Sequence, residues 1–462
     1  MPASADFVRS RSLWLDELSD LAERPALPGD ATADVVVVGA GLTGLWAAYH
    51  LAVARPHARI TVLEREVVGY GASGRNGGWA GSGIAGNPRV YAKAAGWDRT
   101  LAAARLTEAA IDEIGQVVRD EKVECDFVKG GTLVVAANAP QWRRLAQGFE
   151  SATRLGTVEP GSSLLAPEEV RSMVDVPRVA GGLYTPHCAR IQPARLVRGL
   201  AEACERRGVV IHEHTSALSV ERGIVVTDRG RVRAPQVLRA TEAWSGQVAG
   251  ARASYLPLTS MMIATEPLPP EVWDDLGWPD GLTVRDRRHL FFYAQRTPDG
   301  RIAMGGRGAP YRLRAPLAEF GQRDQGVWDR LEHTLREYFP QVGDARITHR
   351  WGGVLAVPRD WSMSVHYDPR TGLGAAGGYS GHGVVAAYLA GRGLADLAAD
   401  RRSDFTEAPW VGHRSRRWEP EPLRYLAANA IVRVLNGADA YEDSTNRRAR
   451  RTRILAPVLP PG

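Results

Sequence analysis

The sequence predicts an α/β fold with two domains, and three observations support this. The chain has 462 residues, which is long for one simple hydrophobic core, so two domains are expected. Four consecutive valines, at 35–38, are typical of a strand buried in a parallel sheet. A glycine-rich turn and an apolar helix follow at once, which is the order of a βαβ unit.

Composition excludes several classes of function. Hydrophobic residues make up 44% and charged residues 24%, as in ordinary globular proteins. The net charge of +6 comes from arginine, and we attribute the Arg-, Ala- and Gly-rich composition to GC-rich coding, so no nucleic-acid partner is expected. Lysine occurs only at positions 93, 122 and 129, which leaves almost no candidates for Schiff-base or P-loop chemistry.

Cysteine usage and the N-terminus favour a cytoplasmic protein. Cys125, Cys188 and Cys204 form no Cys-x-x-Cys pair, which fits a reducing compartment and predicts no metal site. The first 18 residues contain no continuous apolar core of a signal peptide, and no run reaches the roughly 18–20 apolar residues that span a membrane.

The turn after the first strand has the spacing of a dinucleotide-binding motif, GAGLTG. Gly39 permits the tight turn, Gly41 lets the backbone approach a pyrophosphate, and Gly44 lets the helix pack on the strand. Glu64 ends a second strand at 59–63, where an acid accepts hydrogen bonds from ribose hydroxyls. The neighbouring contacts expected in this Rossmann-type unit are Leu42, Thr43 and Arg65.

The segment GYGASGRNGG at 69–78 follows the second strand directly and resembles a loop that flavoproteins of the amine and D-amino-acid oxidase group place against pyrophosphate and isoalloxazine, so we call it the flavin loop. Ser73 and Asn76 can donate hydrogen bonds, and Arg75 can neutralise a phosphate or a flavin oxyanion. Gly77 and Gly78 have no side chains, so their backbone can lie against a flat ring. Gly71 and Ala72 complete the expected contacts of this loop.

These segments together resemble the FAD-dependent family of glycine, sarcosine and D-amino-acid oxidases, and most closely its gamma-glutamylputrescine oxidoreductase branch. The resemblance rests on GAGLTG, LERE, GASGRNGGW, KGGTLVV, ATEAW, YAQRTPDGRIAMGG and GYSGHGV, which extend from about residue 34 to 399. It implies a GR2-like Rossmann domain that binds FAD, interleaved with an α+β substrate domain on a mostly antiparallel sheet.

The domain boundaries follow from this resemblance. We expect an N-terminal arm at 1–29, an FAD domain at 30–88, 160–250 and 350–402, a substrate domain at 89–159 and 251–349, and a helical tail at 403–462. Strands are expected at 132–136, 208–218 and 256–265, with a hairpin around the Pro-Asp-Gly turn at 298–300. A helix should end before Pro340, and another should cover 191–207.

The resemblance implies further cofactor contacts in the second half of the chain. A helix N-terminus after the turn at 378–383 can direct its positive end at the flavin edge where charge accumulates on reduction. The remaining expected contacts are Ala217, Thr241, Trp244, Gly353, Gly378, Tyr379, Ser380, Gly381, His382, Gly383 and Val384.

Three residues are the candidates for contact with substrate. His382 and Tyr379 belong to the flavin-adjacent turn, and Tyr293 lies on the strand that crosses above the flavin in the family. His382 could stabilise charge on reduced flavin, and Tyr293 could form an aromatic wall; core packing is the alternative for both. Arg307 and Arg359 are weaker candidates that could equally be surface charges, and Trp351 is expected in the core or pocket wall.

The sequence departs from the family at known positions. Val385 stands where sarcosine oxidases carry a carboxylate-binding Lys, and GYSGHG lacks the Arg of glycine oxidases, which argues against a small amino acid bound in that manner. His289 falls, by a loose alignment, near a Lys that promotes oxygen reduction. The three cysteines lie far from 354–356, where a covalent flavin link would form, so non-covalent FAD is expected.

The implied reaction is removal of hydride from the carbon beside an amine nitrogen, with oxygen reduced to hydrogen peroxide. The chain should hold that carbon within about 3–3.5 Å of flavin N5. Three alternatives stay open: a dehydrogenase that passes electrons to a quinone or carrier, an FAD-dependent monooxygenase, and a flavin-fold binding protein without turnover.

The tail contains apolar residues at helical spacing between 423 and 434, flanked by arginines. We expect a helix packed on its own domain or on a partner subunit, and contact with a membrane surface is the less favoured alternative. The sequence does not indicate the oligomeric state.

Overall fold

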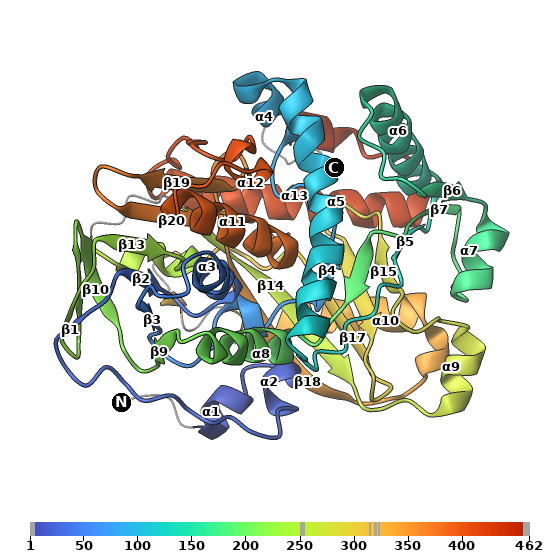
Figure 1. Cartoon of the computed structure of the whole chain (residues 1–462). Coiled ribbons are helices and arrows are strands. Elements are labelled where there is room, and N and C mark those ends of the chain that lie inside the picture. The colour runs from blue at the N-terminus through green and yellow to red at the C-terminus, as the bar shows by residue number, and fades with distance from the viewer. Residues whose placement is uncertain (1–4, 250–254, 314–315, 318–320, 322–323, 456–462) are drawn as a thin grey trace.

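The computed structural model describes residues 5–249, 255–313, 316–317, 321 and 324–455. Two large sheets lie side by side, with the long helix α5 (Trp97–Asp120) running between them in Figure 1. The predicted α/β fold class is confirmed: one sheet is mostly parallel and covered by helices, and the other is mostly antiparallel.

The parallel sheet has six strands in the order β19-β20-β13-β2-β3-β9. Every neighbouring pair is parallel except β19 and β20. Its strands are β2 (Val35–Val38), β3 (Ile60–Leu63), β9 (Val210–His212), β13 (Gln236–Arg239), β19 (Ser364–Asp368) and β20 (Leu373–Gly377). The carboxyl ends of β2, β3, β13 and β20 therefore meet at one edge, where ligands bind in open α/β sheets.

The side chains of the valine strand β2 point alternately to the two faces of the parallel sheet, and a different layer packs on each face. Val35 and Val37 pack in one core with helices α3 (Leu42–Ala54), α8 (Pro193–Arg206) and α11 (Gly383–Ala398). Val36 and Val38 face the opposite side and pack under a four-stranded sheet. That sheet contains β1 (Ala31–Thr32), β12 (Arg231–Arg233), β11 (Ile224–Thr227) and β10 (Ala217–Glu221).

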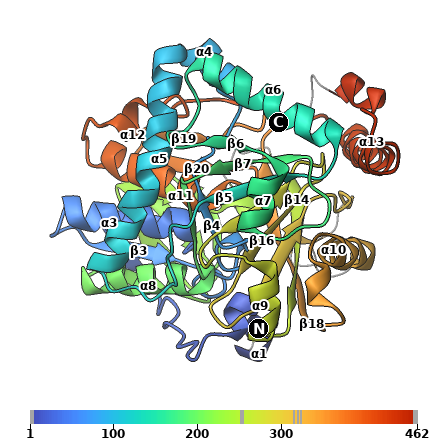
Figure 2. The same ribbon diagram turned by 90° about the vertical axis from the view of Figure 1, so that its right-hand side faces the viewer.

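The second large sheet has eight strands in the order β18-β14-β17-β16-β15-β5-β7-β6. They are β5 (Thr132–Ala136), β6 (Ser163–Leu165), β7 (Gly181–Thr185), β14 (Leu256–Thr265), β15 (Thr283–Asp286), β16 (Phe292–Arg296), β17 (Ile302–Gly306) and β18 (Ile347–Val357). Helices α9 (Pro270–Leu276) and α10 (Gln325–Tyr338) share its core, and Figure 2 shows α10 beside β18. The predicted strands at 132–136 and 256–265, the hairpin and the helix before Pro340 are confirmed.

Two expectations need correction. The segment 208–218 is not one strand, because Glu213 turns inward, His214 takes a positive φ of 49°, and the chain leaves β9 before it enters β10. The segments of β6, β7 and β18 were assigned to the FAD domain by residue number, but they pair within the eight-stranded sheet. The remaining domain boundaries stay predictions.

The remaining helices cover the two halves. They are α1 (Ala5–Arg9), α2 (Leu13–Asp16), α4 (Pro88–Ala95), α6 (Ala139–Leu155), α7 (Pro167–Met173) and α12 (Asp404–Glu407). A short ribbon of β4 (Trp79–Gly81) and β8 (Cys188–Arg190) continues from the flavin loop.

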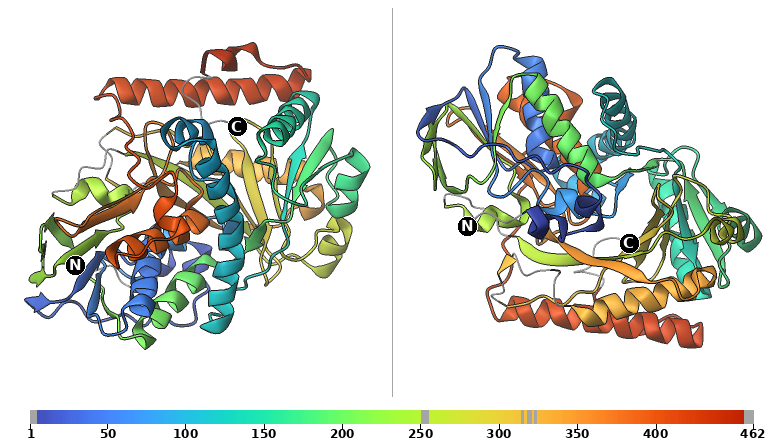
Figure 3. Two further views of the ribbon diagram at one scale, coloured as in Figure 1. Left: turned by 45° about the horizontal axis from the view of Figure 1, so that its top comes forward. Right: turned by 90° about the horizontal axis from the view of Figure 1, so that it is seen from below.

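The tail forms the helix α13 (Leu423–Thr445), which lies along the outside of the molecule in Figure 3. It docks through buried acids: Asp439 accepts hydrogen bonds from the amides of His289 and Leu290, and Glu442 pairs with Arg144. The expected packing of this helix on its own chain is therefore observed. Among the described residues no helix has the length and apolarity required to cross a membrane.

Candidate functional site

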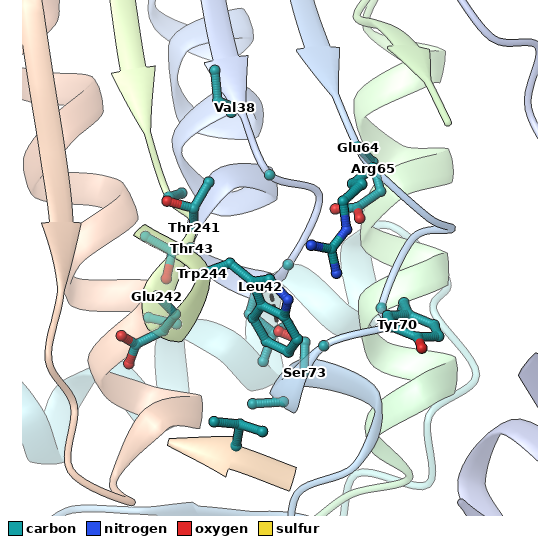
Figure 4. A pocket seen from close by; sticks show the side chains of 18 of the residues that line it. Val38, Leu42, Thr43, Glu64, Arg65, Tyr70, Ser73, Thr241, Glu242 and Trp244 are labelled. Carbon is teal, nitrogen blue, oxygen red and sulfur yellow. Dashed lines mark hydrogen bonds between the residues drawn. The ribbon is translucent and has the colours of Figure 1, made fainter. Parts of the chain in front are cut away.

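A cavity of about 410 Å³ opens at the edge where β2, β3 and β13 end. Figure 4 shows Leu42 near its centre, with Glu64 and Arg65 on one side and Thr43, Thr241 and Glu242 on the other. The cavity continues along the flavin loop to the β20–α11 turn. This is the position at which a doubly wound sheet holds a dinucleotide.

The first glycine turn has the close packing that its sequence predicts. Gly39 takes φ of 105°, a region that favours glycine, and a Cβ there would lie 2.6 Å from the Ala240 carbonyl oxygen. A Cβ on Gly44 would lie 2.0 Å from the Gly39 oxygen, so only glycine lets α3 sit against β2. Gly41 is the N-cap of α3 and lines the cavity with Leu42 and Thr43, so the N-terminus of the helix lies at the cavity wall.

The opposite wall is formed at the end of β3. The Glu64 carboxylate accepts hydrogen bonds from the amides of Ala40 and Glu66 at 2.8 and 3.0 Å, which fixes its orientation at the cavity. The Arg65 guanidinium lies 5.4 Å from the centre of the Trp244 ring and donates to Gln247. Arg65 and Trp244 thus close one side of the cavity.

The flavin loop is joined to the first glycine turn. The Ser73 hydroxyl accepts a hydrogen bond of 2.9 Å from the amide of Leu42, the first residue of α3. Asn76 holds the loop together by donating to the carbonyls of Ala72 and Ser73 and accepting from the Gly78 amide. Loop and helix N-terminus therefore form one continuous wall.

The last glycine turn closes the cavity from the other end. The hydroxyls of Tyr379 and Thr43 are 2.7 Å apart. Glu242, which sequence reasoning missed, accepts hydrogen bonds from the amides of Gly378 and Tyr379 at 3.1 and 3.2 Å. Burial raises the pKa of Glu242 to about 7. Its position in ATEAW, directly after a strand of the parallel sheet, was the available signal.

The structure brings most predicted cofactor residues together. Those that line the cavity are Gly39, Gly41, Leu42, Thr43, Glu64, Arg65, Gly71, Ala72, Ser73, Asn76, Ala217, Thr241, Trp244, Tyr379, Gly381, Gly383 and Val384. Those outside its lining are Gly44, Arg75, Gly77, Gly78, Gly353, Gly378, Ser380, His382 and Tyr293. Gly44 acts through packing, and Gly353 lies against Arg75 and Ala72 of the loop.

Arg75 lies behind the loop rather than in the cavity lining. Its guanidinium is 4.4 Å from the centre of the Tyr70 ring, and Tyr70 itself lines the cavity. Burial, followed by repulsion from Arg11, lowers the pKa of Arg75 to about 10. Its role toward a phosphate or flavin oxyanion stays a prediction.

A second group of residues gathers where the eight-stranded sheet meets the last glycine turn; we call it the recess. It contains Tyr293, His382, Arg285, Phe291 and Arg307. The Tyr293 ring lies against the flavin loop, since a Cβ on Gly77 would be 2.4 Å from its Cε2 atom. The Tyr293 hydroxyl pairs with Ser260 at 2.7 Å.

Two arginines give the recess its charge. The guanidinium carbons of Arg285 and Arg307 lie 4.0 and 4.6 Å from the centre of the Phe291 ring. Arg307 also donates to the Ser380 carbonyl, and the buried Nε of Arg285 has no hydrogen-bond partner among the described residues. Sequence reasoning ranked Arg307 low and missed Arg285. Arg285 lies near the end of β15 and Arg307 follows β17, and only the fold shows that their side chains meet.

The arginines set the charge state of His382. The His382 residue is partly open to solvent at the surface of the recess, although protein atoms surround its ring closely. This burial, together with Arg307 and Arg285, lowers the pKa of His382 to about 4, so the imidazole is neutral near pH 7. Burial, together with Arg287 and Arg307, lowers the pKa of Arg285 to about 9. His289, by contrast, lies at Glu442 on α13.

Comparison with known proteins identifies this arrangement. Residues 34–397 match the model of the DAO family, described as FAD dependent oxidoreductase. The chain belongs to the DAO family of FAD-dependent oxidoreductases. It is 32% identical over 393 residues to "Gamma-glutamylputrescine oxidoreductase" of Escherichia coli K12, which covers 82% of this chain and 87% of that protein. It is 28% identical over 406 residues to "Glycine oxidase" of Pseudomonas aeruginosa PAO1, covering 82% and 98%.

The fold agrees with this assignment. The crystal structure of glycine oxidase from Geobacillus kaustophilus superimposes with a TM-score of 0.70 at 21% identity, covering 84% of this chain and all of that one. As a DAO-family member the protein is an enzyme, its cofactor is FAD, and it is related to amine and amino-acid oxidases.

The residues around the cavity fit FAD. The N-terminus of α3 offers amides to a pyrophosphate, and Glu64 is placed for ribose hydroxyls. The indole nitrogen of Trp244, which lines the cavity, is buried and has no hydrogen-bond partner among the described residues. Buried donors of this kind are normally satisfied, and a polyanionic cofactor supplies acceptors.

Proposed function

We propose that this enzyme oxidises the C–N bond of an amine that also carries a carboxylate, and that oxygen takes up the electrons as hydrogen peroxide. The substrate loses a hydride and a proton to become an imine, which water hydrolyses. The relatives named for gamma-glutamylputrescine and for glycine support an amine or amino-acid derivative as substrate. The two arginines of the recess support a carboxylate group on that substrate.

The pair Arg285 and Arg307 carries the proposal. Both cations face one ring, and neither has a hydrogen bond to a carboxylate among the described residues. A guanidinium withdrawn from water requires an anionic partner, and a carboxylate matches its forked donors. The arginines thereby take the place of the Lys and Arg that the sequence lacks at Val385 and within GYSGHG.

The same charges favour the reactive form of the amine. Hydride can leave only from a carbon beside a neutral nitrogen, because an ammonium group has no lone pair to donate. Two nearby cations lower the pKa of a bound amine, because a like charge disfavours the ammonium form. FAD, when bound, supplies the hydride acceptor. His382, being neutral, can accept a hydrogen bond from the amine without repelling it.

Aromatic residues orient the substrate and exclude water. Trp79 meets Tyr293 edge to face, with ring centres 5.9 Å apart, and Ser260 fixes the Tyr293 hydroxyl. Tyr293 therefore forms a rigid wall beside the flavin loop, and its hydroxyl stays in hydrogen-bond contact without ionising because burial raises its pKa.

The test is an anaerobic titration of the holoenzyme with two matched amines, putrescine and gamma-glutamylputrescine, in which the glutamyl group adds a carboxylate. We expect the carboxylate-bearing amine to bleach the visible flavin band at much lower concentration. Admission of air should restore the band and yield one hydrogen peroxide per substrate. Slow recovery without peroxide would instead indicate a dehydrogenase.

Arg307→Gln and Arg285→Gln should each weaken binding of the carboxylate-bearing amine about 10- to 100-fold, and leave the plain diamine nearly unaffected. Arg296→Gln is the matched control, because Arg296 also lies over an aromatic ring, that of Trp273, but outside the recess. Equal losses for both amines would contradict a carboxylate site.

We also propose that FAD is bound without a covalent link. Cys125, Cys188 and Cys204 are all buried and do not line the cavity, and Cys204 packs against Leu45 of α3. Acid precipitation should therefore release all the flavin into the supernatant; flavin retained in the pellet would disprove this.

A further inference from the structure

The N-terminal residues 5–18 pack against the back of the flavin loop, away from the cavity. Two side chains of this segment hold loop carbonyls: the Ser12 hydroxyl donates to Gly74 O at 2.8 Å, and the Trp14 indole donates to Asn76 O at 2.8 Å. We call Ser12 and Trp14 the N-terminal clamp. Both lie 62 residues from their partners, so the contact is tertiary.

The clamp belongs to a continuous series of contacts. The carbonyls of the five loop residues from Gly74 to Gly78 each accept one hydrogen bond from a different part of the chain. The donors, in loop order, are Ser12, Trp351 Nε1, Trp14, Gln295 Nε2 and the Ile191 amide. The five carbonyls at the carboxyl end of the loop are thus all held by segments outside the loop.

The residues of the N-terminal clamp are held in place by burial and by further hydrogen bonds. Trp14 and Leu15 are fully buried, and the Trp14 ring meets Trp351 edge to face at 6.0 Å. Gln192 donates to the Trp14 carbonyl, which ties the segment to the start of α8. A Cβ on Gly74 would lie 3.6 Å from Leu15, so the loop follows the surface that this segment provides.

The segment lies outside the part of the chain that the family model matches. The family match begins at residue 34, whereas Ser12 and Trp14 precede it by about 20 residues. The shared motifs contain the loop but not the donors that hold two of its carbonyls.

We propose that the N-terminal clamp is part of the FAD site: Ser12 and Trp14 are positioning residues that hold the flavin loop in its FAD-binding conformation. Five of the ten loop residues, at 69, 71, 74, 77 and 78, are glycine, which loses the most backbone entropy when a loop becomes ordered. We therefore expect this loop to be mobile without such contacts. A loop ordered before FAD arrives spares the cofactor that entropic cost.

The test compares the full-length variants Ser12→Ala and Trp14→Phe with Trp278→Phe. Trp278 is also fully buried and its indole also donates to one carbonyl, that of Leu282, but it lies in the core of the eight-stranded sheet. Trp278→Phe therefore removes the same side-chain volume as Trp14→Phe and, like it, one hydrogen bond. The readouts are the FAD dissociation constant of the apoprotein, the shape of the visible flavin band, and the unfolding temperature without FAD.

We expect Ser12→Ala to weaken FAD binding about five-fold and Trp14→Phe ten-fold or more, with a broadened flavin band in both. Trp278→Phe should lower the unfolding temperature but leave FAD affinity within two-fold. If the clamp variants lower only the unfolding temperature, with affinity and spectrum unchanged, the segment is merely structural and the proposal is wrong. Should Trp14→Phe fail to fold, Ser12→Ala, which removes one oxygen atom, decides alone.

Discussion

Thr43 and Tyr379 lie 336 residues apart in the chain, yet their hydroxyls are 2.7 Å apart. Thr43 belongs to the first turn of α3, and Tyr379 belongs to the turn before α11. The bond therefore joins the first and last glycine-rich turns across the FAD cavity, which both residues line.

Tyr379→Phe should weaken FAD binding about five-fold, because it removes this bond without removing the ring. Fluorescence titration of the apoprotein with FAD measures the change. The control is Tyr388→Phe on α11, whose hydroxyl bonds to Glu113 outside the cavity. Equal affinity for the Tyr379 variant and the wild type would show that the two turns are held together by packing alone.

Gly44→Ala should abolish FAD binding and destabilise the fold by about 2–3 kcal/mol, because the added methyl group would overlap the Gly39 carbonyl oxygen. Urea denaturation and the flavin content of the purified protein test this. Gly326→Ala provides the contrast. Gly326 lies in α10 with open space around a new Cβ, so alanine there should stabilise the helix by about 0.5–1 kcal/mol.

Glu242 should make the stability of the apoprotein fall as pH rises. Its pKa is about 7 in the folded chain and 4.5 in the unfolded chain, so the folded state favours the protonated carboxyl. The resulting stabilisation is complete below pH 4.5 and is lost as pH rises through 7. Denaturation of the FAD-free protein between pH 5 and 8 should show this decline, and Glu242→Gln should flatten it; parallel curves would contradict the prediction.

Glu442 should have the opposite pH dependence. Burial opposes its ionisation, but the nearby His289 ring, 3.7 Å away, and the hydrogen bond from Arg144 outweigh burial and hold its pKa at about 2. Its contribution is therefore present above pH 4.5 and is lost as pH falls toward 2.

Glu442→Gln leaves the Arg144 charge without its partner and should destabilise the protein by about 1–3 kcal/mol at pH 7. Glu150→Gln removes an exposed pair with Arg154 and should change stability by less than about 0.5 kcal/mol. If both changes have the same small effect, α13 is not held by its buried acids.

Local patterns were sufficient for the FAD half of the molecule. Four valines, the spacing of Gly39, Gly41 and Gly44, and an acid after the next strand specify one compact βαβ unit, because each feature acts within a short stretch of chain. The flavin loop and the last glycine turn were found in the same way. Residues of both segments line one cavity.

The tertiary structure determined which side chains surround that βαβ unit. Arg285 and Arg307 face one recess only because β15, β16 and β17 pair in a particular register, and Glu242 reaches the last turn only because β13 and β20 are neighbours. Ser12 and Trp14 hold the flavin loop from a segment 62 residues earlier. The sequence by itself determined the fold class and the cofactor, whose signals are local; the charge of the recess depends on side chains distant in the chain, which only folding brings together.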